Sequence, residues 1–177
     1  MQALVFLVNA VVGFFSTLLL LRFMMQWCRV SFAGQLGDFV IRLTDWAVRP
    51  MRRIVPGVGG LDWASLVAAL WLQVLQAALI LSLSAAILNA EGFGLFLMLL
   101  MLTIRGLLRL FIYIVMGVVI LEAVLSWVNP HAPLAGPVRQ LARPFLAPIR
   151  RFVPPIAGVD LSPLVLILLL QVLLMFI

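Results

Sequence analysis

The chain has very few of the residues that usually carry chemistry. Among its 177 residues there is one cysteine, Cys28, one histidine, His131, and no lysine. One cysteine excludes an internal disulfide, and one thiolate with one imidazole is too few ligands for a protein zinc site or a haem axial pair. Cys28 and His131 fall at one predicted membrane face and could form a thiolate–imidazole dyad, but a buried cysteine and a loop histidine are the simpler interpretation. We therefore expect no metal and no cofactor.

Charge is also scarce. Only 10% of the residues are charged, and the net charge of +6 comes from twelve arginines set against six acidic residues. No glycine-rich loop carries the Lys-Ser/Thr pair that cradles phosphate, because residues 57–60 form a bend within a proline-rich link. No segment holds paired carboxylates for acid–base work. The sequence therefore predicts no catalytic residues, and we expect that the protein is not an enzyme.

Long apolar runs are what the chain has in abundance, since 66% of its residues are hydrophobic. Crossing about 30 Å of hydrocarbon takes about 20 mostly apolar residues in a helix. Runs of this kind predict spans at about 4–27, 63–88, 104–127 and 161–177. The first lacks a basic flank and is long, which favours an uncleaved span over a signal peptide. The expected fold is an all-α membrane protein with about four transmembrane helices.

One phrase occurs twice in the chain, and it divides the sequence into two copies. Pro-x-Arg-Arg-x-x-Pro followed by Gly-x-Asp occupies residues 50–62 and again residues 148–160, 98 positions later. This spacing predicts a tandem duplication. We assign residues 1–90 to the first repeat and 104–177 to the second. Residues 91–103 are then a linker or interfacial lead-in, because the apolar run that contains them is too long for one span.

Each repeat contains a segment with the pattern of an amphipathic helix, at residues 36–49 and 137–149. Apolar residues recur every three or four positions, with charged residues on the other side, as in helices that lie in the membrane interface. In the first segment Asp38 with Arg42 and Asp45 with Arg49 are predicted to pair, because each acid precedes its base by four residues. Pro50 is expected to end the first helix and Pro144 to kink the second. Clustered arginines beside apolar spans favour anionic lipid headgroups over nucleic acid as the counter-charge. The arginines expected to face headgroups are Arg42, Arg49, Arg52, Arg53, Arg139, Arg143, Arg150 and Arg151.

Two ionisable residues interrupt the first and third spans at equivalent depths. Arg22 precedes Trp27 by five residues, and Glu122 precedes Trp127 by five residues. Unpaired charges in hydrocarbon are costly, so opposite charges at equal depth favour a salt bridge between the two repeats. The alternative is that each side chain extends independently to the headgroups.

Other polar residues mark the second and fourth spans. Gln73 and Gln171 occupy equivalent positions, and in parallel repeats such residues can meet, so we expect spans two and four to pack side by side. Asp62 and Asp160 precede these spans and are predicted to be helix N-caps. For Asp62, a catalytic or ion-binding role is the alternative.

The distribution of arginine predicts the orientation. Residues 28–61 hold five arginines and residues 129–160 hold four, whereas the turn at 89–92 holds none. By the positive-inside rule both basic segments should be cytoplasmic, with both termini outside. Arg105 and Arg109 are discordant charges, which we explain by contact with headgroups of the outer leaflet.

With its two copies of span, amphipathic helix, doubled arginine phrase and second span, the chain resembles the YggT family of bacterial membrane proteins. The resemblance implies an inner-membrane protein linked to osmotic-stress tolerance and, in some lineages, to cell division or envelope organisation. Similar plastid proteins are linked to cytochrome b6 assembly and nucleoid distribution. The two copies differ at Arg22, whose counterpart is Glu122, and at Asp45, whose counterpart is Arg143. These differences indicate complementary roles for the two halves.

Two functions remain open. The first is a non-catalytic membrane protein that supports assembly, organisation or stress tolerance through lipid and protein contacts. Its partner is a second copy of the chain or another membrane protein, and no direct nucleic-acid binding is expected. The alternative is an oligomeric ion channel or transporter, for which the polar residues within the spans are the argument.

Overall fold

The computed structural model describes residues 2–57, 59–83, 92–153 and 160–177. Within these ranges the secondary structure consists of six α-helices and no strand. In chain order they are α1 (Gln2–Trp27), α2 (Gln35–Ile54), α3 (Trp63–Leu83), α4 (Gly92–Val128), α5 (Ala135–Phe152) and α6 (Ser162–Phe176). The predicted all-helical class is therefore confirmed.

Three of these helices, α1, α3 and α4, are long and apolar enough to cross a membrane. The fourth predicted span corresponds to α6, which is apolar but has only 15 residues and is about 22 Å long. Four crossings therefore remain a prediction. The predicted end of the second span, the turn at 89–92 up to Glu91, and most of the second proline-rich bend lie outside the described residues.

The structure shows no break near residue 104. Residues 92–128 form one continuous helix of 37 residues, so a lead-in to the predicted third span would be helical and continuous with it. From Leu95 to Leu102 the chain consists of Leu, Phe and Met without glycine or proline, which favours a helix. The hydroxyl of Thr103 donates to the carbonyl oxygen of Leu99 at 2.8 Å, which satisfies this polar group within the helix. A repeat boundary in the sequence thus lies inside one helix.

The prediction that Pro50 ends the first amphipathic helix is wrong, because Pro50 lies inside α2, which continues to Ile54. Helix α5 likewise runs through Pro144 and Pro148 to Phe152, and the kink expected at Pro144 stays a prediction. A proline removes one backbone hydrogen bond, but the apolar stripe continues beyond it, and Leu146 is fully buried. Paired arginines in the last turn of each helix also suit the negative end of the helix dipole. Packing and electrostatics outweigh the local preference.

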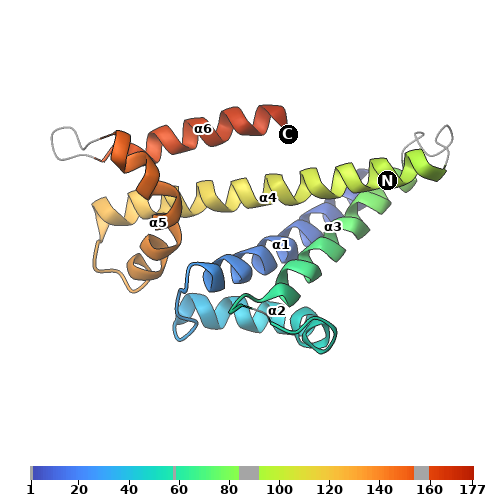
Figure 1. The fold of residues 1–177 in the computed structure, drawn as a ribbon, viewed down its shortest axis with the longest axis horizontal. Helices are drawn as coiled ribbons and strands as arrows, with labels where there is room; N and C mark the ends of the chain where they lie inside the picture. Colours follow the sequence, from blue (N-terminus) through green and yellow to red (C-terminus); the bar gives the residue numbers. More distant parts are fainter. Residues whose placement is uncertain (1, 58, 84–91, 154–159) are drawn as a thin grey trace.

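The six helices form two groups that share α4 (Figure 1). In the first group α1 packs along α3, and α2 crosses both at one end. In the second group α5 and α6 pack against α4 and against each other. The beginnings of α1 and α4 lie toward the end of the molecule opposite α2 and α5 (Figure 1). The two amphipathic helices therefore lie toward the same end.

The predicted packing of the second span against the fourth is wrong. Helix α3 packs on α1, α2 and α4, whereas α6 packs on α4 and α5. Figure 1 shows α6 on the other side of α4 from α3. Accordingly, Gln73 is buried in the first group while Gln171 is exposed on α6.

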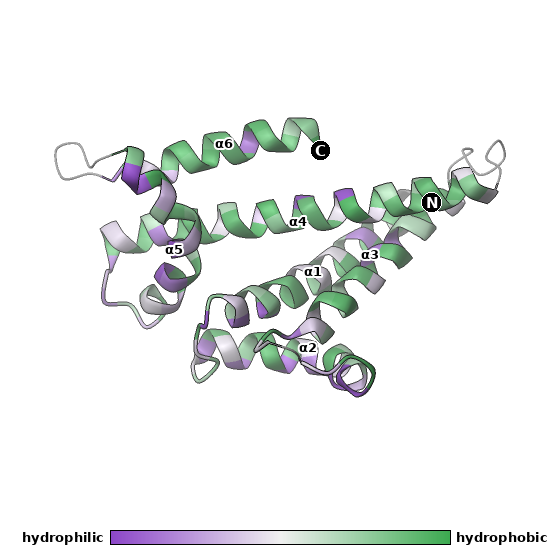
Figure 2. Cartoon of the chain, in the orientation of Figure 1, coloured by the Kyte–Doolittle hydropathy of each residue, from purple (hydrophilic) through white to green (hydrophobic). Residues whose placement is uncertain are grey.

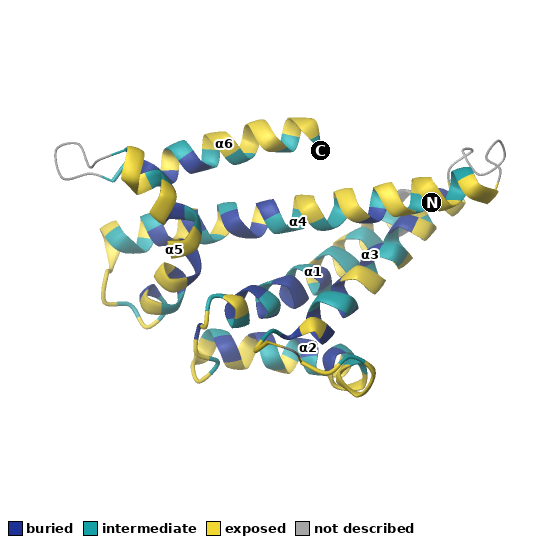
Figure 3. Cartoon of the chain, viewed as in Figure 1, coloured by how far each residue is buried: buried dark blue, intermediate teal, exposed yellow. Residues whose placement is uncertain are grey.

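The buried core lies between the C-terminal half of α1, the amphipathic helices and the adjoining parts of α3 and α4. Alanines of α3 permit close packing of apolar helices, as is usual within membranes. Many large apolar side chains on α1, α3, α4 and α6 are exposed instead. Figure 2 shows the polar residues gathered mainly in α2 and α5, and Figure 3 shows the exposed positions along the apolar helices. This distribution is that of spans surrounded by lipid. The fully buried large side chains are Leu19, Met24, Met25, Val40, Val48, Val115, Val119, Leu141 and Leu146.

Candidate functional site: two charge clusters beneath the amphipathic helices

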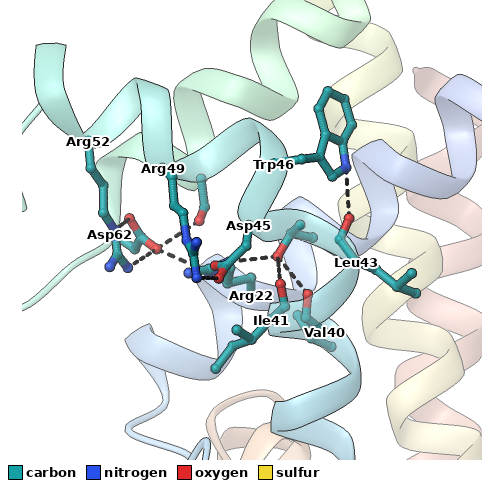
Figure 4. A network of polar contacts seen from close by, with 11 residues as sticks. Arg22, Val40, Ile41, Leu43, Asp45, Trp46, Arg49, Arg52 and Asp62 are labelled. Atoms are coloured by element: carbon teal, nitrogen blue, oxygen red, sulfur yellow. Dashed lines mark hydrogen bonds and ion pairs between the residues drawn. The ribbon is translucent and has the colours of Figure 1, made fainter.

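The first charge cluster, which we define as Arg22, Asp45, Arg52 and Asp62, joins α1, α2 and the start of α3 (Figure 4). Nη1 of Arg22 lies 2.9 Å from Oδ1 of Asp45, and Nε lies 3.3 Å from Oδ2 of Asp62. Nη1 also donates to the hydroxyl of Thr44 at 2.7 Å. The side chain of Arg22 is only 5% exposed, so these partners take the place of water around the guanidinium.

Asp62 is the centre of this cluster. Nη2 of Arg52 donates to Oδ2 of Asp62 at 2.7 Å, and Nε of Arg52 donates to Oδ1 at 3.3 Å. The hydroxyl of Ser65 adds a bond of 2.8 Å to Oδ2. Burial raises the pKa of Asp62, but the hydrogen bonds from Arg52 and Ser65 and the charges of Arg52 and Arg22 outweigh it, so the pKa is lowered overall. Asp62 is thus a buried carboxylate shared by two arginines, in addition to its place at the start of α3.

Asp45 links the buried part of the cluster to the surface. Its Oδ1 pairs with Arg22, and its Oδ2 lies 2.9 Å from Nη2 of Arg49, four residues along α2. Burial acts to raise the pKa of Asp45, and the bonds and charges of the two arginines lower it overall. The predicted pair of Asp45 with Arg49 is therefore confirmed. The analogous pair of Asp38 with Arg42 is absent from the described part of α2.

The second charge cluster, which we define as Glu122, Arg150 and Asp160, joins α4, α5 and the segment just before α6. Nε of Arg150 lies 2.8 Å from Oδ2 of Asp160, and Nη2 lies 3.4 Å from Oε1 of Glu122. Oδ1 of Asp160 accepts the backbone N–H of Ser162 at 2.9 Å, at the first residue of α6. The N-cap position itself is Leu161, so the cap predicted at Asp160 is one residue too early, although its carboxylate still bonds to the start of the helix.

The two clusters have the same plan with one charge reversed. Arg52 and Asp62 correspond to Arg150 and Asp160 at the 98-residue offset, but the apolar helix contributes Arg22 in one cluster and Glu122 in the other. The predicted salt bridge between Arg22 and Glu122 is therefore wrong. Each charge turns toward the amphipathic helix of its own half, where the opposite charge lies 2.9 Å from Arg22 and 3.4 Å from Glu122.

The arginines predicted to face headgroups are all exposed. Three of them also form ion pairs, namely Arg49, Arg52 and Arg150. The remaining five project from α2 and α5 without an ion pair among the described residues: Arg42, Arg53, Arg139, Arg143 and Arg151.

A polar contact between the two halves was not anticipated from the sequence. Nε2 of Gln140 on α5 donates to the carbonyl oxygens of Cys28 and Arg29 at 3.2 and 3.0 Å, just after α1. Arg29 has a φ of 56°, the left-handed conformation that often follows a helix. The rings of Trp27 and Phe145 meet edge to face beside it. One glutamine on a polar helix face forms no sequence pattern, so this contact between the two halves could not be predicted from the sequence.

The alternative thiolate–imidazole dyad finds no support. Cys28 is half-buried and His131 is exposed, with no hydrogen bond between them. Burial raises the pKa of the Cys28 thiol, which favours the protonated form over the reactive thiolate. Within the described residues no group of three potential metal-binding side chains comes together.

Together the clusters fasten each amphipathic helix to the ends of two apolar helices. In the first cluster Arg22 and Asp62 are buried, so removing one partner there leaves an unpaired buried charge. The second cluster is more accessible, because Glu122 is its one buried member. Including Arg49, the first cluster carries three guanidiniums and two carboxylates, whereas the second carries one guanidinium and two carboxylates. The two clusters, as distinct from the two halves, therefore carry net charges of opposite sign.

Comparison with known proteins agrees with this description. A family model described as CCB3/YggT matches residues 1–83 and 101–177. The chain is 35% identical to the uncharacterized protein YggT of Escherichia coli (strain K12) over 97% of this chain and 87% of that protein. It is also 35% identical to an uncharacterized protein of Pseudomonas aeruginosa, over 92% of this chain and 81% of that protein. No solved structure matches. On this match, which extends over nearly all of its length, the chain belongs to the CCB3/YggT family.

Proposed function

We propose that this protein is a non-catalytic protein of the bacterial inner membrane that supports membrane and envelope organisation, assembly or osmotic-stress tolerance through lipid and protein contacts. The observation that carries the proposal is the pair of amphipathic helices, each held by a charge cluster that contains a buried charge of an apolar helix, with further arginines left on the outside. Such a surface binds anionic headgroups and positions the helices without any reacting group.

The charge of the exposed arginines supports an orientation toward anionic lipid. Near an anionic membrane surface each arginine contributes about 1 kcal/mol, so the five unpaired arginines form a substantial electrostatic anchor. Since α2 and α5 lie toward the same end of the molecule, both can meet one leaflet.

We propose that residues 28–61 and 129–160 face the cytoplasm, with both termini outside. A C-terminal alkaline phosphatase fusion should be active. An inactive phosphatase fusion, together with a C-terminal fluorescent-protein fusion that fluoresces, would place the C-terminus in the cytoplasm and reject this orientation.

The functional test is complementation in a bacterium that lacks its gene for this family. A variant with Arg42, Arg53, Arg139 and Arg143 replaced by glutamine should fail to restore growth at high osmolarity. A matched variant with lysine at the same four positions keeps the charge and should restore it. Full activity of the glutamine variant, at equal protein levels in the membrane, would reject a role based on headgroup contacts. Chemical crosslinking in the same membranes tests whether the protein partner is a second copy of the chain.

An oligomeric channel or transporter is the second candidate, and one observation favours it. Glu122 is buried within an apolar helix, and its cluster carries an excess of negative charge that could attract a cation. One copy has too few spans to enclose a pore, so this function requires several copies. Ion flux into proteoliposomes that is lost on Glu122→Gln would favour the channel. Absence of flux at any protein density would favour the first proposal.

A further inference from the structure

A polar cleft opens between α1, α3 and α4, away from the two charge clusters. Its volume is about 390 Å³, within the range of small-ligand sites. Five polar side chains line it, although all five come from apolar helices: Asn9, Gln73, Gln76, Arg105 and Arg109. None of the residues that line the cleft is acidic.

The carboxamides form a chain across two helices. Nε2 of Gln73 donates to Oε1 of Gln76 at 3.1 Å, and Nε2 of Gln76 donates to Oδ1 of Asn9 at 3.1 Å. Each amide nitrogen carries two protons, and these bonds use one proton of each glutamine, so N–H groups remain available to an acceptor. Gly106 permits the close approach of α4, because a Cβ atom there would collide with Oε1 of Gln73.

The two arginines of the cleft are exposed and lack the carboxylate partners that the arginines of the two charge clusters have. Arg22, Arg52 and Arg150 all pair with carboxylates. In contrast, Arg105 and Arg109 lie one turn apart on α4, line the cleft and form no ion pair among the described residues. Two like charges on an apolar helix are unfavourable unless an anion compensates them.

The position of these arginines along α4 indicates where that anion comes from. Arg105 and Arg109 precede Trp127 by 22 and 18 residues, or about 33 and 27 Å of helix. The hydrocarbon layer is about 30 Å thick, so an upright α4 with Trp127 at one interface places the arginines at the opposite headgroups. A tilted α4 places them deeper, where an unpaired charge costs more. Both positions favour a bound anion.

We propose that this polar cleft binds a phosphate group, with Arg105 and Arg109 as the charged ligands and the amides of Asn9 and Gln76 as hydrogen-bond donors. Arginine forks match phosphate geometry, and the absence of a lining carboxylate leaves the site selective for anions. The phosphate can belong to a phospholipid headgroup or be free in solution. The inference extends the lipid contacts of the proposed function to a second and separate place, because the cleft shares no residue with the arginine surfaces of α2 and α5.

The experiment is native mass spectrometry of the full-length protein in a neutral detergent, titrated with phosphatidylglycerol, diacylglycerol or inorganic phosphate. Two variants remove the site in different ways. R105Q/R109Q removes both charges, while G13L keeps them and fills the cleft, since a Cβ on Gly13 meets no atom within 4 Å. R29Q is the control, because it removes an exposed arginine that lies outside the cleft and outside the arginine surfaces of α2 and α5. Circular dichroism confirms that each variant remains helical.

At about 1 kcal/mol per arginine, R105Q/R109Q should weaken the affinity for the first bound phosphatidylglycerol about 30-fold. G13L should also lose it, R29Q should stay within about threefold of wild type, and diacylglycerol should not bind in its place. Binding of inorganic phosphate that depends on the same two arginines, without retention of phosphatidylglycerol, would identify free phosphate as the ligand. Equal binding of diacylglycerol, or a loss in R29Q equal to that in R105Q/R109Q, would overturn the proposal. Neither result would affect the complementation test of α2 and α5, so the two proposals can fail separately.

Discussion

Asp62 and Asp160 occupy the same position in the two halves, yet substitution by asparagine should affect them very differently. Asp62 is 2% exposed and holds two guanidiniums, one of them on the buried Arg22. Asp62→Asn leaves that guanidinium with Asp45 as its remaining carboxylate. Breaking a buried pair in this way costs about 3 to 5 kcal/mol. Asp160 is 35% exposed, and its partner Arg150 is also accessible to solvent, so its pair contributes about 1 kcal/mol or less.

The difference between the two variants is measurable by thermal unfolding in detergent, with intrinsic tryptophan fluorescence as the readout. For a chain of this size 1 kcal/mol corresponds to about 2 to 4 °C, so Asp62→Asn should lower Tm by about 6 °C or more. Asp160→Asn should lower it by no more than about 4 °C under the same conditions. Equal losses in the two variants would show that burial does not set the contribution of these carboxylates. A loss below about 2 °C for Asp62→Asn would show that Arg22 does not depend on Asp62.

Three further outcomes follow from the same geometry. The folded-state pKa of Asp62 is lowered, so the stabilisation by its carboxylate is complete above the unfolded pKa of about 3.9 and is lost as pH falls further. Tm of the wild type should therefore decline more steeply below about pH 4 than Tm of Asp62→Asn. Arg22→Met and Glu122→Met should be additive to within about 0.5 kcal/mol in the double variant, and a coupling above about 1 kcal/mol would mean that the two residues touch. Arg29→Gly should raise Tm by about 2 °C, since glycine adopts φ of 56° without strain; a lower Tm would mean that the Arg29 side chain contributes more than its backbone costs.

Features that depend on local pattern could be predicted from the sequence. Three long apolar runs form the helices α1, α3 and α4, because about 20 apolar residues in a row admit few other structures in a membrane. The amphipathic segments at 36–49 and 137–149 form the cores of α2 and α5, since an apolar stripe with helical period specifies both the helix and its buried face. The pair of Asp45 with Arg49 belongs to the same class, because it is one turn of a single helix.

Helix boundaries were predicted less well, because they depend on competition between local conformational preferences and tertiary packing. Pro50 disfavours helix at the residue before it, but the buried stripe of α2 and the arginines of its last turn extend the helix past that point. The repeat predicts a boundary near residue 104, but apolar residues and leucines continue on both sides of it, and α4 runs through it.

The partners of the buried charges were decided only by the tertiary structure. The sequence places Arg22 and Glu122 at equal depth, because depth follows from the number of residues along a helix. It contains no information on the rotation of α1 relative to α4, and this rotation turns each charge toward its own amphipathic helix. In the same way, the offset of Gln73 and Gln171 specifies equivalence but not contact, and α6 packs on the far side of α4. The hydrophobic period and the length of a helix are properties of one segment. The direction in which its side chains point and the residues that they contact depend on how the helices pack together.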